Sequence, residues 1–341
     1  MRGRWRRWHR AVAAVKRPRI FVTQPIAESA LKRLRAAADV KVNPDSSKII
    51  KKSALIAAVR KHDILFPLLH DVVDRAVLAA NPKLRAVTAM AITPDNIDVA
   101  EATKRGIPVT VVPPIVAEAT ADIHFGLLIA VARRMIEGDR MVRANKFPGS
   151  QSNHLAGAAV YGKTIGLVGG GGRIGQAVAR RARGFGMRIL YWSPRQKPEA
   201  ERELQMEFVT LERLFKDSDF VSLHPPLNAQ THHMIGPREF AQMKPTAFIV
   251  NTARGAIIDE AAMIRALIKK QIAGAGLDVF EHEPKVSDKL RKMKNVVLTP
   301  HLGSAVMSVR EVMANIVADN VLALLDHQKP PNCINPEVLK L

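Results

Sequence analysis

The stretch Lys163–Gly175, KTIGLVGGGGRIG, constrains the fold more than any other part of the chain. Residues 165–168 are typical of a buried parallel strand, and the alanine-rich residues 176–183 are typical of a helix. Between them, Gly170-x-Gly172-x-x-Gly175 has the spacing that permits a tight turn, close approach of a pyrophosphate and close packing of helix on strand. The stretch therefore predicts a dinucleotide site. An additional glycine, Gly169, lengthens the join between strand and loop.

Short β-branched runs alternate with amphipathic helical patterns on both sides of residue 113. In the first part the strand candidates are residues 19–22, 40–42, 64–66, 84–89 and 109–112, separated by helical patterns at 28–38, 53–61, 74–80 and 98–104. In the second part the strand candidates are residues 165–168, 188–192, 220–224, 247–251, 274–279 and 296–299. Such alternation predicts parallel sheets with helices on both faces. The expected fold class is α/β, with two doubly wound parallel-sheet domains.

The remaining segments indicate how the two parts connect. Two prolines at 113–114 mark a boundary, and residues 118–142 form one long helical pattern. A final helix is expected over residues 304–325. The tail, residues 330–341, is too short to be a domain, so we expect it to return to the N-terminal half.

Composition is that of an ordinary soluble globular protein. The 341 residues are enough for two substantial cores, with 47% hydrophobic and 24% charged residues. The single cysteine, Cys333, excludes an internal disulfide framework and suits a cytoplasmic protein. No apolar run approaches the roughly 18 residues of a membrane span. The best candidate, residues 123–132, contains a histidine and is better interpreted as a buried helix.

Residues 1–19 contribute eight of the 21 net positive charges, because they hold eight lysines and arginines and no acid. Such a segment can bind nucleic acid or acidic lipid, or direct targeting. We favour a basic disordered extension over residues 1–18, because the fold pattern begins only at Arg19. The other positive charges are spread along the chain without aromatic residues between them. They favour anionic small molecules in general and make a nucleic-acid partner unlikely.

Four polar signals follow strand candidates of the second part, at the edge where doubly wound sheets bind ligands. Each alone has a purely structural explanation as a strand cap, a surface ion pair, a charged loop or a buried histidine. Together they would bring a guanidinium, a carboxylate and an imidazole into one crevice. The signals are His224-Pro-Pro, Asn251-Thr-Ala-Arg254-Gly255, Asp278-Val-Phe-Glu-His-Glu283-Pro284 and Pro300-His301-Leu-Gly303.

With these motifs the chain resembles the D-isomer-specific 2-hydroxyacid dehydrogenase family over roughly residues 19–331. The intervals also fit that family's Arg–Glu–His set, because Glu283 follows Arg254 by 29 residues and His301 follows Glu283 by 18. The resemblance implies a Rossmann coenzyme domain, residues 117–303, inserted in a flavodoxin-like substrate domain formed by residues 19–116 and 304–341. It also implies an active site between the two domains and a homodimer formed through the coenzyme domains.

The resemblance assigns the catalytic roles to Arg254, Glu283 and His301, and the chemistry of these residue types agrees. Reduction of a 2-keto acid needs a hydride and a proton for the developing alkoxide, which His301 would supply. Glu283 would stabilise the imidazolium, and Arg254 offers a planar fork of donors for the substrate carboxylate. No metal is expected. The coenzyme-binding residues would be Gly170, Gly172, Arg173, Ile174, Gly175, Ser193, Arg195, His224, Thr252, Ala253 and Asp278.

Coenzyme choice depends on the residue after the second strand of the dinucleotide fold. An acid there binds the ribose 2′-hydroxyl of NAD, whereas a nearby arginine suits the 2′-phosphate of NADP. This chain places Ser193 at the acid's position, with Arg195 beside it and Lys197 close. We therefore predict a preference for NADP(H), with NAD(H) also possible. Alternatively, Ser193 is only a turn residue and the ribose is recognised elsewhere.

The match is weaker in the loop expected to bind the substrate carboxylate. Family members commonly carry a glycine two residues before their Asp-x-Ile-Asp pattern, where this chain has Thr93 followed by Pro94, which donates no amide. Substrate identity is therefore open. Residues 66–69 either form the opposing wall, which suits a small substrate, or belong to a loop beside the core. Glyoxylate and hydroxypyruvate are the first candidates, on resemblance and coenzyme preference.

Two other functions are compatible with this scaffold. The first is oxidation of phosphite or another unusual anion. The second is a binding protein that senses a dinucleotide and acts through protein partners, as transcriptional corepressors of this fold do. The complete set of Arg254, Glu283 and His301 favours catalytic turnover over sensing.

Overall fold

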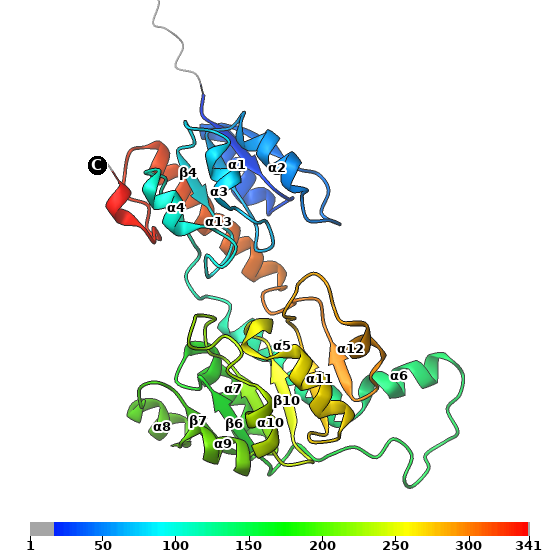
Figure 1. The fold of residues 1–341 in the computed structure, drawn as a ribbon. Helices are drawn as coiled ribbons and strands as arrows, with labels where there is room; N and C mark the ends of the chain where they lie inside the picture. The colour runs from blue at the N-terminus through cyan, green and yellow to red at the C-terminus, as the bar shows by residue number, and fades with distance from the viewer. Residues whose placement is uncertain (1–16, 340–341) are drawn as a thin grey trace, which may run out of the picture. The chain divides into compact units, whose positions relative to one another are not determined.

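A computed structural model describes residues 17–339 (Figure 1). Most of the predicted basic extension, residues 1–16, lies outside the described residues. Contacts divide the chain into two compact units, one formed by residues up to 113 together with 310 onward, and the other by residues 114–309. The sequence-based boundaries lay at 116/117 and 303/304, a few residues away. Among the described residues, no helix combines the length and the apolar character needed to cross a bilayer.

The first unit contains a five-stranded sheet in which all neighbouring strands are parallel. The strands β1, β3 and β4 are buried on both faces, as expected for central parallel strands, whereas the edge strand β2 is partly exposed. The strand order β2-β1-β3-β4-β5 is the flavodoxin-like order. The strands are β1 (Arg19–Val22), β2 (Asp39–Val42), β3 (Ile64–Phe66), β4 (Ala86–Thr88) and β5 (Val109–Thr110).

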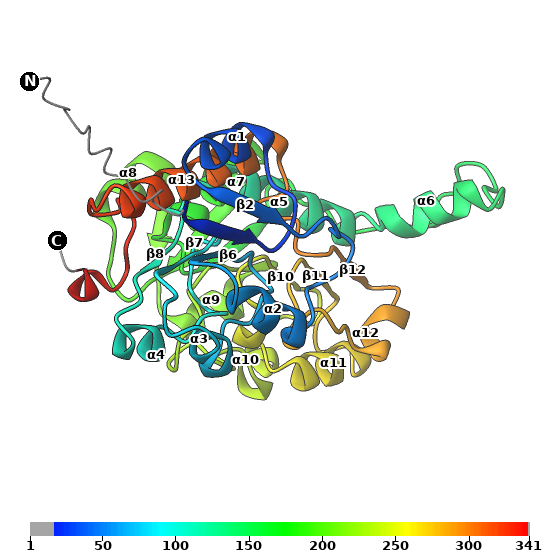
Figure 2. The ribbon, with the colours of Figure 1, turned by 90° about the horizontal axis from the view of Figure 1, so that it is seen from above.

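Helices cover both faces of this sheet (Figure 2). The helices α2 (Lys52–Val59), α3 (Arg75–Ala79) and α4 (Val99–Lys104) pack on one face through a core that contains Leu55, Val77 and Ala102. On the other side α1 (Glu28–Ala37) lies along α13 (Met307–Leu325). Ser29 of α1 donates a hydrogen bond of 2.8 Å to Glu311 of α13. The C-terminal helix is thus part of the first unit.

The tail after α13 returns to the first sheet, as the sequence analysis expected. Cys333 forms an antiparallel bridge with Thr110 of β5. The backbone N–H of Ile334 donates to the carbonyl of Val109 at 2.9 Å, and the Asn335 side chain accepts from the Val109 N–H at 2.7 Å. These bonds cover the β5 edge of the sheet, which would otherwise present unpaired backbone groups.

The second unit contains a seven-stranded parallel sheet in the order β12-β11-β10-β9-β6-β7-β8. Chain direction across the sheet reverses between β6 and β9, so this is the switch point at which doubly wound sheets bind ligands. The predicted fold class of two parallel α/β sheets is confirmed. The strands are β6 (Thr164–Val168), β7 (Arg188–Trp192), β8 (Met206–Phe208), β9 (Phe220–Leu223), β10 (Phe248–Asn251), β11 (Gly274–Leu277) and β12 (Val296–Leu298).

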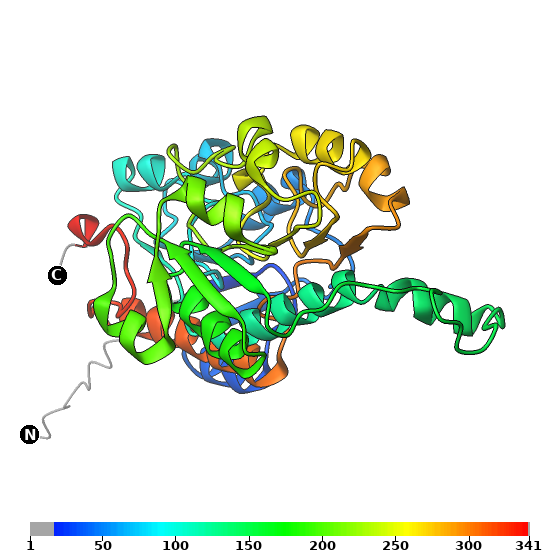
Figure 3. The same cartoon turned by 90° about the horizontal axis from the view of Figure 1, so that it is seen from below.

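Helices lie on both sides of this sheet (Figure 3), and each face has its own hydrophobic core. One core joins the strands to α5 (Ala117–Ala132), α7 (Arg173–Gly184) and α8 (Pro198–Leu204). The other joins them to α9 (Leu211–Asp217), α10 (Pro237–Gln242) and α11 (Glu260–Ile268). A short helix, α12 (Asp288–Lys292), precedes β12. Strand β8 and the helices α8 to α12 were not predicted from the sequence.

The single helix predicted over residues 118–142 is wrong. The structure contains two helices, α5 and α6 (Met135–Arg143), and Arg134 between them adopts a left-handed backbone with φ 54°. The Arg134 guanidinium binds both carboxylate oxygens of Glu137 at 2.8 and 2.9 Å, which holds the turn. Within this unit, α6 extends away from the sheet (Figures 1 and 2).

Candidate active site

Gly169 is the turning point between β6 and the glycine loop. Its φ of +81° lies in the left-handed region that favours glycine. A β-carbon here would lie 2.8 Å from the carbonyl carbon of His224, which follows β9. The extra glycine that the sequence left unexplained therefore makes the reversal possible and lets the loop approach the end of β9 at the switch point. Gly169, and not Gly170, is therefore the residue that makes the tight turn.

The rest of the glycine loop leads into the N-terminus of α7. Gly172 is the residue that caps this helix, and Arg173 is its first residue. The amides of residues 173–175 have no partner within the helix, and the first turn carries no acidic side chain. A β-carbon on Gly175 would lie 2.6 Å from the α-carbon of Gly170, so only glycine allows this contact. The amides and the helix dipole form a site for an anion such as a pyrophosphate.

Ser193 and Tyr191 position the turn after β7 beside this loop. Ser193 is buried, and its hydroxyl accepts a hydrogen bond of 2.8 Å from the Gly171 N–H. The Tyr191 hydroxyl donates to Glu201 at 2.6 Å and accepts from the Lys197 N–H at 2.7 Å. Burial raises the pKa of Tyr191 to about 12, so the hydroxyl stays protonated. The turn is thus tied both to the glycine loop and to α8.

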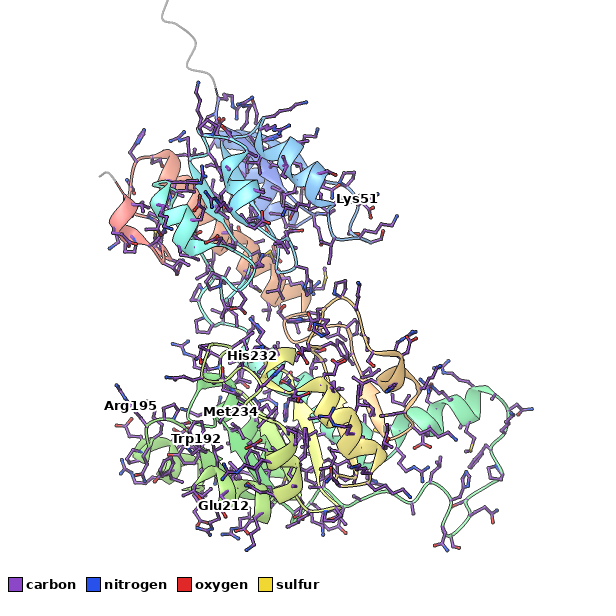
Figure 4. The ribbon with its side chains drawn as sticks, viewed as in Figure 1. Lys51, Trp192, Arg195, Glu212, His232 and Met234 are labelled. Atoms are coloured by element: carbon purple, nitrogen blue, oxygen red, sulfur yellow. The ribbon has the colours of Figure 1, made fainter. Side chains whose placement is uncertain are left out.

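Cationic side chains surround this turn. Arg195 is exposed, and Figure 4 shows it extending outward from the turn that follows Trp192. The Lys197 side chain passes over the glycine loop, because a β-carbon on Gly171 would lie 2.9 Å from Lys197 Cγ. Among the described residues, no acidic side chain occupies the position after β7 where NAD-binding folds place one. The local charge therefore favours an anionic group on the ribose.

His224 directly follows β9 and Thr252 directly follows β10, at the same edge of the sheet. Beneath them lies a buried network that the sequence analysis missed. His124 of α5 is fully buried, and its Nε2 is 2.7 Å from the Ser222 hydroxyl of β9, while its Nδ1 is 3.2 Å from the Thr252 hydroxyl. The Ser222 hydroxyl is also 2.6 Å from Nε2 of His224. The only sequence signal was a histidine within an apolar helix, which is usually a core residue.

The loop after β10 carries Arg254. Asn251 fixes the loop, because its side-chain oxygen accepts from the Ala253 N–H and its amide donates to the Arg254 carbonyl, both at 2.9 Å. The Arg254 guanidinium donates to the carbonyl of Ala253 at 2.7 Å. A β-carbon on Gly255 would lie 1.9 Å from the carbonyl carbon of Phe280, so glycine is required for this loop to contact the loop after β11.

Asp278 organises the loop that carries His301. One carboxylate oxygen accepts from the Thr299 hydroxyl at 2.6 Å and the Leu302 N–H at 2.7 Å, and the other accepts from the Gly303 N–H at 2.9 Å. Burial raises the pKa of this carboxyl. These bonds hold His301 in a left-handed backbone conformation, φ 55°, which is uncommon for a residue with a side chain. The residue expected to contact the coenzyme thus has a clear role within the protein.

Glu283 and His301 form a direct pair at this edge. His301 Nδ1 is 2.9 Å from one carboxylate oxygen of Glu283, and the other oxygen accepts from the Phe280 N–H at 2.9 Å. Both side chains are mostly buried, with 19% and 17% of their surfaces exposed. A carboxylate in this position orients the imidazole, because it accepts the hydrogen bond from Nδ1. The pair is suited to holding a proton and releasing it.

The three residues of the predicted catalytic set lie on neighbouring strands. Arg254 follows β10, Glu283 lies in the loop after β11, and His301 follows β12, and these strands are adjacent in the sheet. The glycine loop follows β6 at the same edge. A parallel sheet thus brings together an anion site at a helix N-terminus, a cationic turn and an acid–base pair. These residues fit a dinucleotide that lies along the edge.

The loops expected to meet the substrate lie in the first unit. The Thr93 hydroxyl donates to the Asp95 carboxylate at 2.8 Å, and the Pro94 carbonyl accepts from the Ile97 N–H at 2.8 Å. Thr93 and Pro94 therefore shape a compact turn after β4. Of the proposed wall, Phe66 is fully buried and belongs to the core, while Leu68 pairs with Met90 through a parallel bridge.

Comparison with known proteins identifies the family. Residues 125–303 match the model of the D-isomer specific 2-hydroxyacid dehydrogenase, NAD binding domain. A glyoxylate reductase from Thermococcus litoralis is 47% identical over 327 residues, which cover 95% of this chain and 98% of the relative. A glyoxylate reductase from Thermococcus gammatolerans is 49% identical over 329 residues, with the same coverage of each chain.

Solved structures agree in fold. A crystal structure of a Thermus thermophilus protein superposes with a TM-score of 0.86 at 39% identity, covering 93% of this chain and 99% of the other. An NADPH-dependent glyoxylate/hydroxypyruvate reductase from Sinorhizobium meliloti, in complex with NADP and malonate, has a TM-score of 0.81 at 29% identity. That match covers 96% of this chain and 99% of the other.

Proposed function

This chain belongs to the D-isomer specific 2-hydroxyacid dehydrogenase family, and we propose that it is an NADPH-preferring reductase of small 2-keto acids. Family membership makes it an NAD(P)-dependent oxidoreductase. The observation that carries the proposal is the Glu283–His301 pair, placed at the same sheet edge as the glycine loop. Glyoxylate and hydroxypyruvate are the first candidate substrates, because similar proteins are named glyoxylate reductase or glyoxylate/hydroxypyruvate reductase.

His301 would serve as the acid that completes the reduction. A bound reduced nicotinamide supplies the hydride, which leaves an alkoxide that needs a proton. Because Nδ1 of His301 is bonded to Glu283, we assign proton delivery to Nε2. Glu283 would keep the ring oriented and favour its protonated form before transfer. In the reverse direction the same nitrogen would accept the proton of a 2-hydroxy acid.

Arg254 would bind the substrate anion. Its guanidinium presents two parallel N–H donors, which match a carboxylate and a neighbouring carbonyl oxygen better than a lysine would. The Asn251 side chain fixes the backbone of Ala253 and Arg254. Because this loop is already ordered, less conformational entropy is lost when the substrate binds. The substrate is therefore a small anion, and Arg254 would bind its carboxylate.

The preference for NADPH rests on the turn after β7. Ser193 provides no carboxylate to repel a 2′-phosphate, and Arg195 and Lys197 provide positive charge beside the glycine loop. The NADP complex of the Sinorhizobium meliloti reductase supports the same choice. Thr252, Ala253 and His224 would line the coenzyme farther along the edge. NADH would remain a weaker alternative.

The two units would bind different ligands, as the family resemblance implies. The second unit would be the dinucleotide domain and the first would be the substrate domain, completed by α13 and the tail. We also propose that the chain forms a homodimer through its coenzyme domains. The exposed apolar side chains of α6 support such an association.

A spectrophotometric panel tests the proposed function. The purified chain is offered glyoxylate, hydroxypyruvate and pyruvate with NADPH and with NADH, and phosphite with NADP⁺ and NAD⁺. We expect reduction of glyoxylate or hydroxypyruvate, with a higher kcat/KM for NADPH than for NADH.

Other outcomes of the panel would select another function. Oxidation of phosphite alone would favour the anion dehydrogenase. Binding of NADPH without reduction of any keto acid would favour a dinucleotide-sensing protein. A clear preference for NADH would overturn the coenzyme assignment and leave the reaction class intact.

A further inference from the structure

A chain of four hydrogen-bonded side chains lies beneath the switch point of the second unit. It connects His224, Ser222, His124 and Thr252 in that order, with donor–acceptor distances of 2.6, 2.7 and 3.2 Å. The two imidazole rings are also in contact, with centroids 4.9 Å apart. Both ends of the chain, His224 and Thr252, follow strands at the edge where the coenzyme is proposed to lie. The third member, His124, is fully buried.

Both histidines are neutral. Burial lowers the pKa of His124 well below its ordinary value and lowers that of His224 to about 3. A neutral imidazole carries a hydrogen on one nitrogen and a lone pair on the other. Each ring can therefore donate at one nitrogen only. The Ser222 hydroxyl has a single hydrogen, so it donates to one histidine and accepts from the other.

The His224 end of this series of hydrogen bonds determines which group donates in each bond. Nδ1 of His224 is buried and, among the described residues, has no hydrogen-bond partner. A buried N–H without an acceptor is rarer than a buried lone pair without a donor, so Nδ1 carries the lone pair. Nε2 of His224 then donates to Ser222, and Ser222 donates to Nε2 of His124. Nδ1 of His124 consequently donates to the Thr252 hydroxyl oxygen.

We propose that His124 is a positioning residue that makes the Thr252 hydroxyl a hydrogen-bond donor to the bound coenzyme. Because Thr252 accepts from His124, its own hydrogen points elsewhere, and at this edge an acceptor on the dinucleotide would receive it. A carbonyl, phosphate or ribose oxygen has the required chemistry. The inference rests on the proposed function only in requiring that a nicotinamide dinucleotide binds along this edge.

Three substitutions at His124 separate the two halves of the chain. In His124→Asn the amide nitrogen takes the place of Nδ1 and keeps the donor to Thr252. In His124→Gln the amide reaches the place of Nε2 and keeps only the bond to Ser222. His124→Leu removes both bonds and fills the volume. At Thr252, Ser keeps the hydroxyl and Val removes it with little change in shape.

The dissociation constant of NADPH, measured by calorimetry without substrate, is the principal readout. Loss of one such hydrogen bond weakens binding by about fivefold, because its net contribution is close to 1 kcal/mol. We expect that loss in His124→Gln, His124→Leu and Thr252→Val, and affinity close to wild type in His124→Asn and Thr252→Ser. The double variant His124→Leu/Thr252→Val should bind no more weakly than either single variant, because both act through one bond.

A second readout needs no coenzyme. Nitrogen NMR of the histidine rings should show His124 protonated at Nδ1 and His224 at Nε2 in the free protein. The reverse tautomers would overturn the proposal, as would additive losses in the double variant or unchanged affinity in folded Thr252→Val. A wild-type chain that bound no dinucleotide would overturn it too. A chain that bound NADPH but reduced no keto acid would refute the proposed function and leave this inference standing.

Discussion

At the scale of single residues, the proposed coenzyme preference rests on Ser193 and Arg195. Ser193 already accepts a hydrogen bond from the Gly171 N–H, a bond that an aspartate at this position could also accept. The loop geometry would therefore survive Ser193→Asp, while the substitution would place a negative charge facing the ribose. Arg195 is exposed and available to a 2′-phosphate. Both positions were proposed from the sequence, because Ser193 occupies the position of the expected acid, at a fixed distance from the glycine loop, and Arg195 stands beside it.

Arg195→Ala should lower kcat/KM for NADPH by about tenfold to a hundredfold, the value of a hydrogen bond to a charged group, and leave kcat/KM for NADH nearly unchanged. Steady-state kinetics with both coenzymes measures the ratio. Arg202→Ala, at an exposed arginine of α8, is the matched control and should change neither value. Equal losses with both coenzymes would argue against a contact with the 2′-phosphate.

The buried histidines His124 and His224 predict that the free energy of unfolding falls in acid. The pKa values of His124 and His224 in the folded protein lie below the ordinary 6.5, so the unfolded chain takes up more protons as pH falls. Their contribution to stability is present above pH 6.5 and is lost below it, by up to ~1.4 kcal/mol per pH unit for each ring. Urea unfolding between pH 5 and 8 should show this fall in the free energy of unfolding.

The variant His124→Gln should reduce that pH dependence by about one proton. The exposed His154→Gln is the control and should leave the slope as in wild type. An unchanged slope in His124→Gln would mean that His124 takes up a proton as readily in the folded protein as in the unfolded chain, so that burial does not lower its pKa. No sequence pattern predicts this network, because Ser222 and Thr252, which bond to His124, are 98 and 128 residues away from it.

At the scale of elements, sequence periodicity located most strands and the glycine loop. Strands β6 and β7 were predicted almost residue for residue, because buried parallel strands are continuous apolar runs. The division between α5 and α6 was not predicted, since Arg134 continues the helical pattern and only its left-handed backbone ends α5. Gly169 was seen but not explained, because its need for glycine arises from His224, which is distant in sequence.

The helix α6 predicts the association state. None of its side chains is buried, and Met135, Ile136 and Val142 are 54%, 40% and 62% exposed. Clustered exposed apolar side chains indicate a protein interface. We expect a homodimer in light scattering after size exclusion, and a monomer for Ile136→Asp/Val142→Asp. The control Ile268→Asp, at an equally exposed position of α11, should remain dimeric. A monomeric wild type would remove α6 from any subunit interface.

At the scale of the whole molecule, the order of strands explains why the three residues proposed to be catalytic lie at one edge although they are far apart in sequence. Arg254, Glu283 and His301 are brought to one edge because β10, β11 and β12 are adjacent and parallel. The alternating pattern predicted two sheets, and four ordered motifs predicted the family. The sequence could not reveal how Asp278 holds the His301 loop, because those bonds depend on three-dimensional contacts.

The central claim is that His301 provides the proton at this edge. The most direct test is kcat/KM for glyoxylate with NADPH in wild type and His301→Gln, alongside the dissociation constant of NADPH and an exposed control, His282→Gln. We predict that His301→Gln loses about 10²- to 10⁴-fold in kcat/KM and binds NADPH as wild type does, as removal of a general acid requires. A His301→Gln enzyme that retained the activity of His282→Gln would contradict the account.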